Sequence, residues 1–349
     1  MTIRPASLLQ RPNQATPAPS MPAGPGPDTL SDVLRTVRLT GSVFFLSEIS
    51  SPCEAARVPE GALLAPALAP RTQNVISYHV VAEGACWAGL YQGAPVRLEA
   101  GDVLVFPHGD SYYIGLERAI PGAPDVQAVI GYLRAISTGQ LPFAMSNGGG
   151  GPERAQLVCG FLGCDQRPFN PLLDSLPRMM IMRGGKRSAG DRLDRLIELA
   201  LAEAQEQNPG GESVRLRLSE LVFVEAIRRH LASMPHGETG WLAGLRDQAV
   251  GRALASLHAQ PTHAWTLTSL AKASGTSRSA LADRFNRLVG QPPMQYLMRW
   301  RMQLAAQLLS DGWAKVAAVA GQVGYDSEAA FSRAFKKVAG VAPATWRRA

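Results

Sequence analysis

Hydrophobic residues between about Leu30 and Ile120 come in short runs that are rich in valine, isoleucine and aromatic side chains. Runs of this kind predict β-strands, and the glycines between them predict turns. The predicted strands are Val75–Val81, Ala85–Tyr91, Val103–Pro107 and Ser111–Gly115. Several short strands at such spacing are typical of an antiparallel sandwich or a small barrel.

The strand pattern stops after this region and then returns. Residues 121–155 read as loop and end in SNGGGGPE (Ser146–Glu153), which predicts a flexible insertion. A further strand is predicted at Ala155–Asp165, and a short helix with an extended segment at Asn170–Arg183. We therefore expect residues 29–186 to form one β domain. Residues 1–28 are rich in proline, alanine, serine and glutamine and predict a disordered tail.

Two helices are predicted within residues 187–240. The apolar residues of the first recur with helical spacing, at Leu193, Leu196, Ile197, Ala200, Leu201 and Ala204. The second is expected from about Ser213 to Ser233, with its apolar side at Leu218, Leu221, Val222 and Leu231. One interpretation is that this pair only caps the β domain. The other is that it also forms the two-fold seam of a homodimer.

The C-terminal part of the chain repeats itself. Gly275 in the first copy matches Gly324 in the second at an offset of 49 residues, and the offset then becomes 50. At that offset the matched pairs are Ser277 with Ser327, Leu281 with Phe331, Phe285 with Phe335, Gly290 with Gly340, Pro293 with Pro343, and Tyr296 with Trp346. One register held over so many glycine, proline and aromatic positions indicates an internal duplication.

Each copy has the pattern of a helix-turn-helix unit. A short helix, Leu267–Ala273 or Ala314–Val323, leads to a glycine that can turn the chain sharply, and a serine follows where the next helix needs an N-cap. The second helix is expected to bury Leu281, Phe285 and Leu288 in one copy, and Phe331, Phe335 and Val338 in the other. Between the copies, Pro293–Ser310 predicts one helix about 27 Å long. Such a helix could hold the two second helices about one DNA turn, roughly 34 Å, apart.

Charge and composition fit this division. The chain carries a net charge of +7, but residues 240–349 alone hold 14 Lys/Arg against 5 Asp/Glu, or +9, which leaves −2 for residues 1–239. A basic C-terminal part with a nearly neutral front suggests that the C-terminal part binds a polyanion. No apolar run of membrane-spanning length and no secretory signal is visible, so a cytoplasmic protein is expected.

The segments SGTSRSALADRFNRLVGQPPMQYL and VGYDSEAAFSRAFKKVAGVAP resemble, in order and spacing, the DNA-binding domain of the AraC/XylS family of bacterial transcription regulators. The resemblance covers about Asp247–Arg348 and implies an all-α DNA-binding domain at residues 241–349. It implies double-stranded DNA as the partner and a DNA-binding transcription regulator as the function. We expect an activator, for which RNA polymerase would be a further partner.

The resemblance places base contacts on the second helix of each unit. In the first unit Ser279, Ala282 and Asp283 occupy the family's base-contacting positions, whereas an alternative is that this helix mainly positions the protein on phosphates. In the second unit Arg333 is the best candidate for reading guanine, and Arg347 and Arg348 are further candidates for phosphate contacts. The candidate DNA-binding residues are Ser277, Arg278, Ser279, Ala282, Asp283, Asn286, Arg287, Ser327, Glu328, Ala329, Ser332, Arg333, Lys336 and Lys337.

The front of the chain resembles the cupin-type sensing domain that precedes some AraC-type DNA-binding domains. The segments VISYHVVAEGACWAGL and VRLEAGDVLVFPHGDSYYI carry this resemblance over about Asp28–Arg183. Cupin enzymes hold a metal with three histidines and a glutamate, but here only His79 and His108 stand near such positions, with Glu83 as a third candidate and Tyr112 in place of a further histidine. We therefore expect no metal and no other cofactor.

A small effector or an oxidant is the expected signal for this front domain. Candidate residues of an effector pocket are His79, Trp87, Tyr91, His108 and Tyr112, and the alternative for each aromatic side chain is packing in the core. Cys86, Cys159 and Cys164 are redox candidates, against the alternative of buried free thiols. The whole chain is thus expected to be an α+β multidomain regulator and not an enzyme. The alternative function is a metal-dependent cupin enzyme fused to a DNA-tethering domain.

Overall fold

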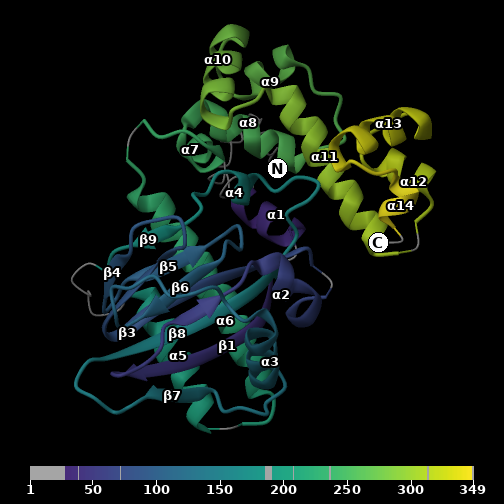
Figure 1. The fold of residues 1–349 in the computed structure, drawn as a ribbon. Coiled ribbons are helices and arrows are strands. Elements are labelled where there is room, and N and C mark those ends of the chain that lie inside the picture. The colour runs from purple at the N-terminus through teal and green to yellow at the C-terminus, as the bar shows by residue number, and fades with distance from the viewer. Residues whose placement is uncertain are drawn as a thin grey trace, which may run out of the picture.

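A computed structural model describes residues 28–37, 39–70, 72–184, 191–206, 208–235, 237–312 and 314–347. The predicted tail therefore lies outside the described residues, except for Asp28, whose carboxylate caps the first helix by accepting from the Ser31 amide. Figure 1 shows a β-rich half built from the front of the chain and a helical half built from its end. Among the described residues, no helix is both long and apolar enough to cross a membrane.

The β-rich half is a curled, mostly antiparallel sheet, so the expected fold class is confirmed. Its neighbours run in the order β2-β6-β3-β8-β1-β7, with β4 and β5 also paired to β3, and β9 paired to β5. The strands are β1 (Thr40–Ser50), β2 (Ala56–Val58), β3 (Asn74–Leu90), β4 (Val96–Glu99), β5 (Val103–Phe106), β6 (Tyr112–Gly115), β7 (Ala144–Gly148), β8 (Arg154–Cys164) and β9 (Met180–Met182).

Strand β3 corrects one prediction. The sequence predicted two strands with a turn at Gly84, but Asn74–Leu90 forms a single strand of 17 residues. Gly84 has a φ of +73° and lies beside a register shift between Val81 and Glu83, so the strand bends there without ending. Because a bulge re-aims a strand while preserving pairing, the two halves of β3 pair with different neighbours, β5 first and then β4 and β6.

The predicted flexible insertion at residues 121–155 was also wrong. This segment contains helix α3 (Val126–Ser137), which Asp125 caps by accepting from the Ala128 amide, and strand β7, which pairs in parallel with β1. Leu133 and Ile136 of α3 are buried against the sheet. Of the glycines that suggested a flexible connector, Gly148 ends β7 and pairs with Ser50 of β1, and residues 149–151 lie in the short connection between β7 and β8.

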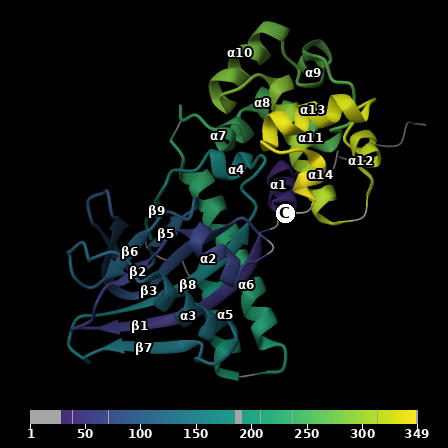
Figure 2. The ribbon, with the colours of Figure 1, turned by 45° about the vertical axis from the view of Figure 1, so that its right-hand side comes forward.

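Helices cover the β-rich half and connect it to the rest of the chain. Figures 1 and 2 show α5 and α6 packed against one face of the sheet, and α1 between the two halves of the molecule. The Tyr78 hydroxyl of β3 donates to the carbonyl of Ser219 on α6, 3.1 Å away. The helices of this half are α1 (Thr29–Thr36), α2 (Gly61–Leu68), α3, α4 (Pro171–Asp174), α5 (Arg192–Glu206) and α6 (Gly211–Ser233).

The helical half confirms the prediction of two helix-turn-helix units joined by one long helix. Its helices are α7 (Trp241–Arg246), α8 (Gln248–Ala259), α9 (Leu267–Ala273), α10 (Arg278–Val289), α11 (Pro293–Ser310), α12 (Val316–Gln322), α13 (Glu328–Ala339) and α14 (Pro343–Trp346). The first unit shares a continuous hydrophobic core with the β-rich half, which includes Phe169, Trp241 and Phe285. The second unit has its own core around Phe331 and Phe335, formed with the C-terminal part of α11.

Candidate functional site

The turn of each helix-turn-helix unit is built as the repeated sequence predicts. Gly275 and Gly324 have φ values of +66° and +80°, a conformation that glycine adopts without the strain of a side chain. Ser277 and Ser327 then cap α10 and α13, each side chain accepting from the backbone amide three residues on at 3.2 Å. The two second helices therefore begin in the same way and present equivalent faces.

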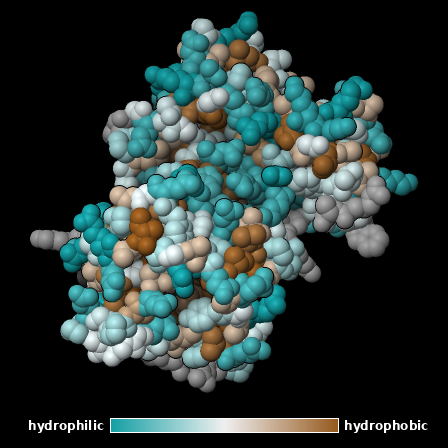
Figure 3. All heavy atoms as spheres, in the orientation of Figure 1, coloured by the Kyte–Doolittle hydropathy of each residue, from teal (hydrophilic) through white to brown (hydrophobic). Residues whose placement is uncertain are grey.

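The buried side of each second helix fixes which side remains free. Leu281 and Phe285 of α10, and Phe331 and Phe335 of α13, are fully buried. Helical geometry then turns the residues between them outward. Figure 3 shows hydrophilic residues over much of the helical half on the face drawn there.

Most of the candidate DNA-binding residues of α10 lie on this outward side. Ser277, Arg278, Ser279, Asp283, Asn286 and Arg287 are exposed, and Ala282 is half-buried. Arg284 is different, because its guanidinium pairs at 2.6 Å with Asp247, which caps α8. Arg284 thus has a structural partner within the domain, whereas no ion pair involving Arg278 or Arg287 is found among the described residues.

Helix α13 presents a more basic face. Ser327, Glu328, Ala329, Arg333, Lys336 and Lys337 are exposed and Ser332 is half-buried. Arg347, which the sequence suggested as a phosphate contact, instead donates to the carbonyl of Ala314 and closes the second unit. Arg348 lies outside the described residues.

Helix α11 joins the two units and is held by buried polar contacts near its start. The Trp241 indole donates to the hydroxyl of Tyr296 at 2.8 Å, and Nε2 of His258 lies 2.7 Å from the same hydroxyl. Burial lowers the pKa of His258 to about 3, so this imidazole is neutral at neutral pH. Because α11 has no internal proline beyond its first turn, it is suited to transmit a fixed spacing between the units.

The β-rich half contains a cavity of about 530 Å³. Its lining follows the two-residue period of strands, with Phe45, Ser47 and Ile49 on β1, and Leu157, Cys159 and Phe161 on β8. Helix α3 covers it with Val129, Tyr132 and Leu133, and the exposed residues Glu54 and Ala56 line it where it meets the surface. The lining is predominantly apolar, as is usual for a small-molecule site. Sequence patterns missed α3 as a wall, because nothing local indicates that it packs on this sheet.

The predicted effector residues do not gather in one place. Only His79 lines the cavity, and Tyr112 lies directly behind it, with its hydroxyl 2.6 Å from Nε2 of His79. Trp87 lies under the guanidinium of Arg118, and Tyr91 donates to the carbonyl of Gly122. Neither Trp87, Tyr91 nor His108 lines this cavity.

These positions do not fit the metal site of cupin enzymes. Both ring nitrogens of His79 face protein groups, Cys159 on one side and Tyr112 on the other. Nε2 of His108 lies 2.9 Å from the carbonyl of Leu176, and Glu83 is exposed. Within the described residues no three histidine, cysteine or acidic side chains come together in a way that could hold a metal ion.

The cysteines fall into two groups that the sequence did not separate. Cys53 and Cys159 line the cavity, whereas Cys86 and Cys164 do not. Burial raises the pKa of Cys86 to about 12 and raises the pKa of Cys159 and Cys164 as well. All three thiols are therefore protonated at neutral pH. Since oxidants attack the thiolate, this protonation disfavours direct oxidation at the three redox candidates.

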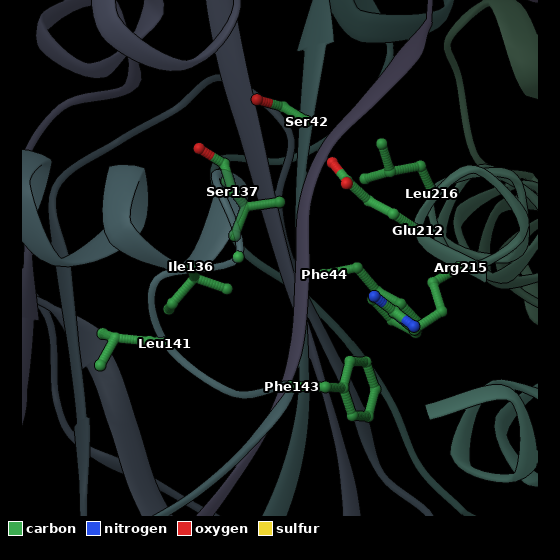
Figure 4. Close-up of a pocket in the computed structure, with 11 residues that line it drawn as sticks. Ser42, Phe44, Ile136, Ser137, Leu141, Phe143, Glu212, Arg215 and Leu216 are labelled. Carbon is green, nitrogen blue, oxygen red and sulfur yellow. The ribbon is translucent and has the colours of Figure 1, made fainter. Parts of the chain in front are cut away.

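A smaller pocket, drawn in Figure 4, lies between β1 and α6. Arg215 of α6 reaches over the ring of Phe143, with its guanidinium carbon 5.5 Å from the ring centroid, and Phe143 packs edge-on against Phe44. At about 60 Å³ this pocket has room for little more than water. Its side chains join α6 to the sheet and leave the larger cavity as the candidate ligand site.

Comparisons with known proteins agree with both halves. A cupin family matches residues 28–232 and a helix-turn-helix domain family matches residues 270–349. A putative AraC-like transcription regulator of Streptomyces antibioticus is 33% identical over 280 residues, which cover 79% of this chain and 88% of that protein. The HTH-type transcriptional regulator AlkR of Acinetobacter baylyi is 27% identical over 277 residues, covering 79% and 89%. The solved DNA-binding domain of AdpA in complex with a target DNA is 28% identical and covers 29% of this chain and 91% of that one, with a TM-score of 0.28.

Proposed function

The chain belongs to the AraC-like transcription regulators, and from this premise we propose that a small apolar molecule in the β1–β8–α3 cavity controls its binding to DNA. The protein is a DNA-binding transcription regulator. We assign the DNA-contacting surface to α10 and α13 on one observation. These two equivalent, capped helices bury their apolar sides and leave their polar and basic sides exposed. The alternative of a metal-dependent enzyme lacks a donor set within the described residues.

The proposal for base reading separates the two units. In α13 the exposed guanidinium of Arg333 offers the two-pronged donor that guanine recognises, while Lys336 and Lys337 follow on the next turn and would contact phosphates. In α10 the outward residues at the centre, Ser279, Ala282 and Asp283, are short or acidic. Arg278 and Arg287 would supply the phosphate contacts of the first unit. The second unit is thus proposed to give the stronger base discrimination.

The cavity supports the proposal of a neutral, apolar effector. Its walls are predominantly apolar, and the imidazole of His79 in its lining is uncharged at neutral pH because burial lowers the pKa of His79 to about 3. Among the described residues that line the cavity, the one lysine or arginine is Arg57, and its guanidinium pairs with Glu54 at 3.7 Å. An uncharged ligand that fills the apolar volume is favoured by both observations.

We also propose that the protein forms a homodimer through the outer face of α5 and α6. Three large apolar side chains are exposed on these two helices, Leu199 by 52%, Val214 by 42% and Leu221 by 50%. Val214 and Leu221 are seven residues apart and share a helix face. Exposed leucine and valine on one face indicate a contact surface.

The remaining proposals follow from DNA binding. The chain is proposed to act in the cytoplasm, where bacterial DNA lies, and to act by binding without catalysis. Activation, with RNA polymerase as a further partner, stays a prediction.

The experiment that tests the function selects genomic DNA fragments with the full-length protein and then measures their affinity against random duplex DNA at several salt concentrations. Selected fragments should bind about 10³-fold or more tightly than random DNA. Equal affinity for both, with the same salt dependence, would leave only non-specific binding and would overturn the proposal.

A further inference from the structure

Cys159, His79 and Tyr112 form a line of hydrogen-bonding groups at the inner wall of the cavity. The sulfur of Cys159 lies 3.1 Å from Nδ1 of His79, and Nε2 of the same ring lies 2.6 Å from the Tyr112 hydroxyl. Tyr112 is itself fixed, because its ring is fully buried and stacks on Phe106 with 3.8 Å between centroids. A thiol, an imidazole that can accept its proton, and a third group that orients the imidazole form the arrangement of an activated nucleophile.

Access distinguishes this thiol from the other buried thiols. Cys159 and His79 both line the 530 Å³ cavity, which also reaches the surface residues Glu54 and Ala56. Cys86 and Cys164 are just as buried, but they neither line the cavity nor lie within hydrogen-bonding distance of a histidine in the described structure. A small molecule that enters the cavity therefore meets one buried thiol with a base beside it.

We infer that Cys159 is a covalent capture site for small, neutral, apolar electrophiles of the α,β-unsaturated carbonyl class, with His79 as the base. The inference rests on the proposed effector cavity and names a class of ligand for it.

The chemistry balances without an added oxidant or reductant. A bond forms between Sγ of Cys159 and the β-carbon of the electrophile, and the carbon–carbon π pair moves onto the carbonyl to give an enolate. The thiol proton passes to Nδ1 of His79 and then from the imidazolium to the α-carbon, so that the imidazole returns to its neutral form. Tyr112 holds the ring by accepting from Nε2–H, which leaves Nδ1 free to accept.

The resting state of the pair explains the selectivity that we expect. Burial raises the pKa of the Cys159 thiol and lowers the pKa of His79, so both are neutral until the electrophile arrives. Thiols add to such electrophiles through the thiolate, so a buried thiol without a base beside it should react slowly. The predominantly apolar lining of the cavity disfavours charged reagents. Proton transfer within the reacting pair removes the need for a thiolate in advance.

The test treats the native full-length protein with N-ethylmaleimide, a small neutral acceptor of this class, and measures adduct formation at each cysteine by peptide mass spectrometry over time. We expect Cys159 to react at least about tenfold faster than Cys86 and Cys164, the buried thiols without a histidine. A maleimide that carries a sulfonate should label Cys53 near the surface but not Cys159. Equal rates at Cys159, Cys86 and Cys164 would overturn the inference.

Two variants separate activation from mere access. His79→Gln should keep the cavity but slow labelling of Cys159 about tenfold, and Tyr112→Phe should slow it less, because the base remains. Continued protection of Cys86 and Cys164 reports that each variant is folded. If the labelling rate of Cys159 is the same in folded His79→Gln as in the wild type, the imidazole does not act as the base and the inference is wrong. Because no DNA enters this assay, its outcome is independent of the DNA-selection experiment.

Discussion

The backbone amide of Phe169 donates to Oε1 of Gln303 at 3.0 Å. This hydrogen bond joins the β-rich half to α11, the helix that links the two helix-turn-helix units. Gln303 is polar but only 2% exposed. The Phe169 ring packs edge-on against the ring of Tyr296, and the Arg299 guanidinium lies over it, 4.1 Å from the ring centroid. Phe169 follows β8, the strand that carries Leu157, Cys159 and Phe161 into the cavity. Phe169 lies only five residues after Cys164, the last residue of β8, so this hydrogen bond links the strand that lines the cavity to α11.

Replacement of Gln303 by leucine should destabilise the protein by about 1–3 kcal/mol, because the buried Phe169 amide would lose its acceptor. Urea unfolding of the variant and the wild type measures this difference. Gln295→Leu is the matched control, since Gln295 lies exposed on the same helix and should change stability by no more than about 0.5 kcal/mol. Equal effects of the two substitutions would show that the Phe169–Gln303 contact contributes nothing specific.

Local signals predicted the helical half more completely than the sensor half. The caps at Ser277 and Ser327, the glycine turns and the bounds of α11 all depend on residues close in sequence, so the repeat alone indicates them. The unbroken course of β3 and the folding of residues 121–155 depend on β8 and β1, which lie far away in the chain. The cavity arises only when α3 packs on the sheet, and no pattern within α3 identifies that contact.

The candidate residues show the same division. Outward positions on α10 and α13 follow from helical periodicity once Leu281 and Phe285, or Phe331 and Phe335, are assigned to the core. By contrast, His79 and Cys159 are 80 residues apart and meet only because β3 and β8 are paired in register at these two residues. Single-sequence reasoning could name both residues but could not place them together.

Acid should destabilise the protein through its two buried neutral histidines. Burial lowers the pKa of both His79 and His258 to about 3, below the value near 6.5 of the unfolded chain. The unfolded state therefore binds protons that the folded state does not, so stability is full above pH 6.5 and is lost as the pH falls below it. At pH 5 each histidine should account for about 2 kcal/mol of the loss.

Urea unfolding of His258→Gln and wild type at pH 7 and pH 5 tests this expectation. The variant should lose about 2 kcal/mol less than the wild type between the two pH values, because one of the two titrations is gone. His263→Gln serves as the control, since His263 is exposed, and it should show the wild-type dependence. Identical losses in all three proteins would mean that His258 binds protons equally in the folded and unfolded states, which contradicts the lowered pKa.

Leu221→Asp should dissociate the proposed homodimer. Leu221 is 50% exposed near the middle of α6, so a two-fold antiparallel contact of α6 would bury it against the same residue of the second copy. A buried aspartate at its centre would be unpaired and costly. Sedimentation velocity should show a dimer for the wild type and a monomer for Leu221→Asp.

Leu63→Asp provides the control for this measurement. Leu63 is also 50% exposed but lies on α2, away from the proposed face. It should leave the dimer intact. A monomeric wild type, or equal effects of both substitutions, contradicts the assignment of the dimer contact to α6.

Ala128→Trp should block the sensor cavity. Ala128 lines the cavity from the exposed side of α3, so a tryptophan can cover the opening with little cost to folding. Fluorescence titration with the neutral apolar probe N-phenyl-1-naphthylamine should show binding to the wild type and at least about a tenfold weaker binding to the variant. Gln127→Trp, on the same helix but outside the cavity lining, should bind as the wild type does. Equal binding to all three would place the probe elsewhere.

Arg333→Ala and Lys337→Ala should weaken DNA binding in different ways. Arg333 is proposed to donate two hydrogen bonds to one guanine, so its loss should cost about 1–3 kcal/mol on selected DNA and relax base preference at one position. Lys337 is proposed to neutralise one phosphate, so its loss should weaken binding equally for all sequences. The slope of the logarithm of the binding constant against the logarithm of the salt concentration should become less steep by about 1. Affinity measured on the selected fragments and on single-base variants of them, at several salt concentrations, separates the two patterns. A loss of affinity for Arg333→Ala that is the same for all sequences would show that Arg333 contacts a DNA phosphate and not a base. Base discrimination would then have to come from the shorter side chains of α10.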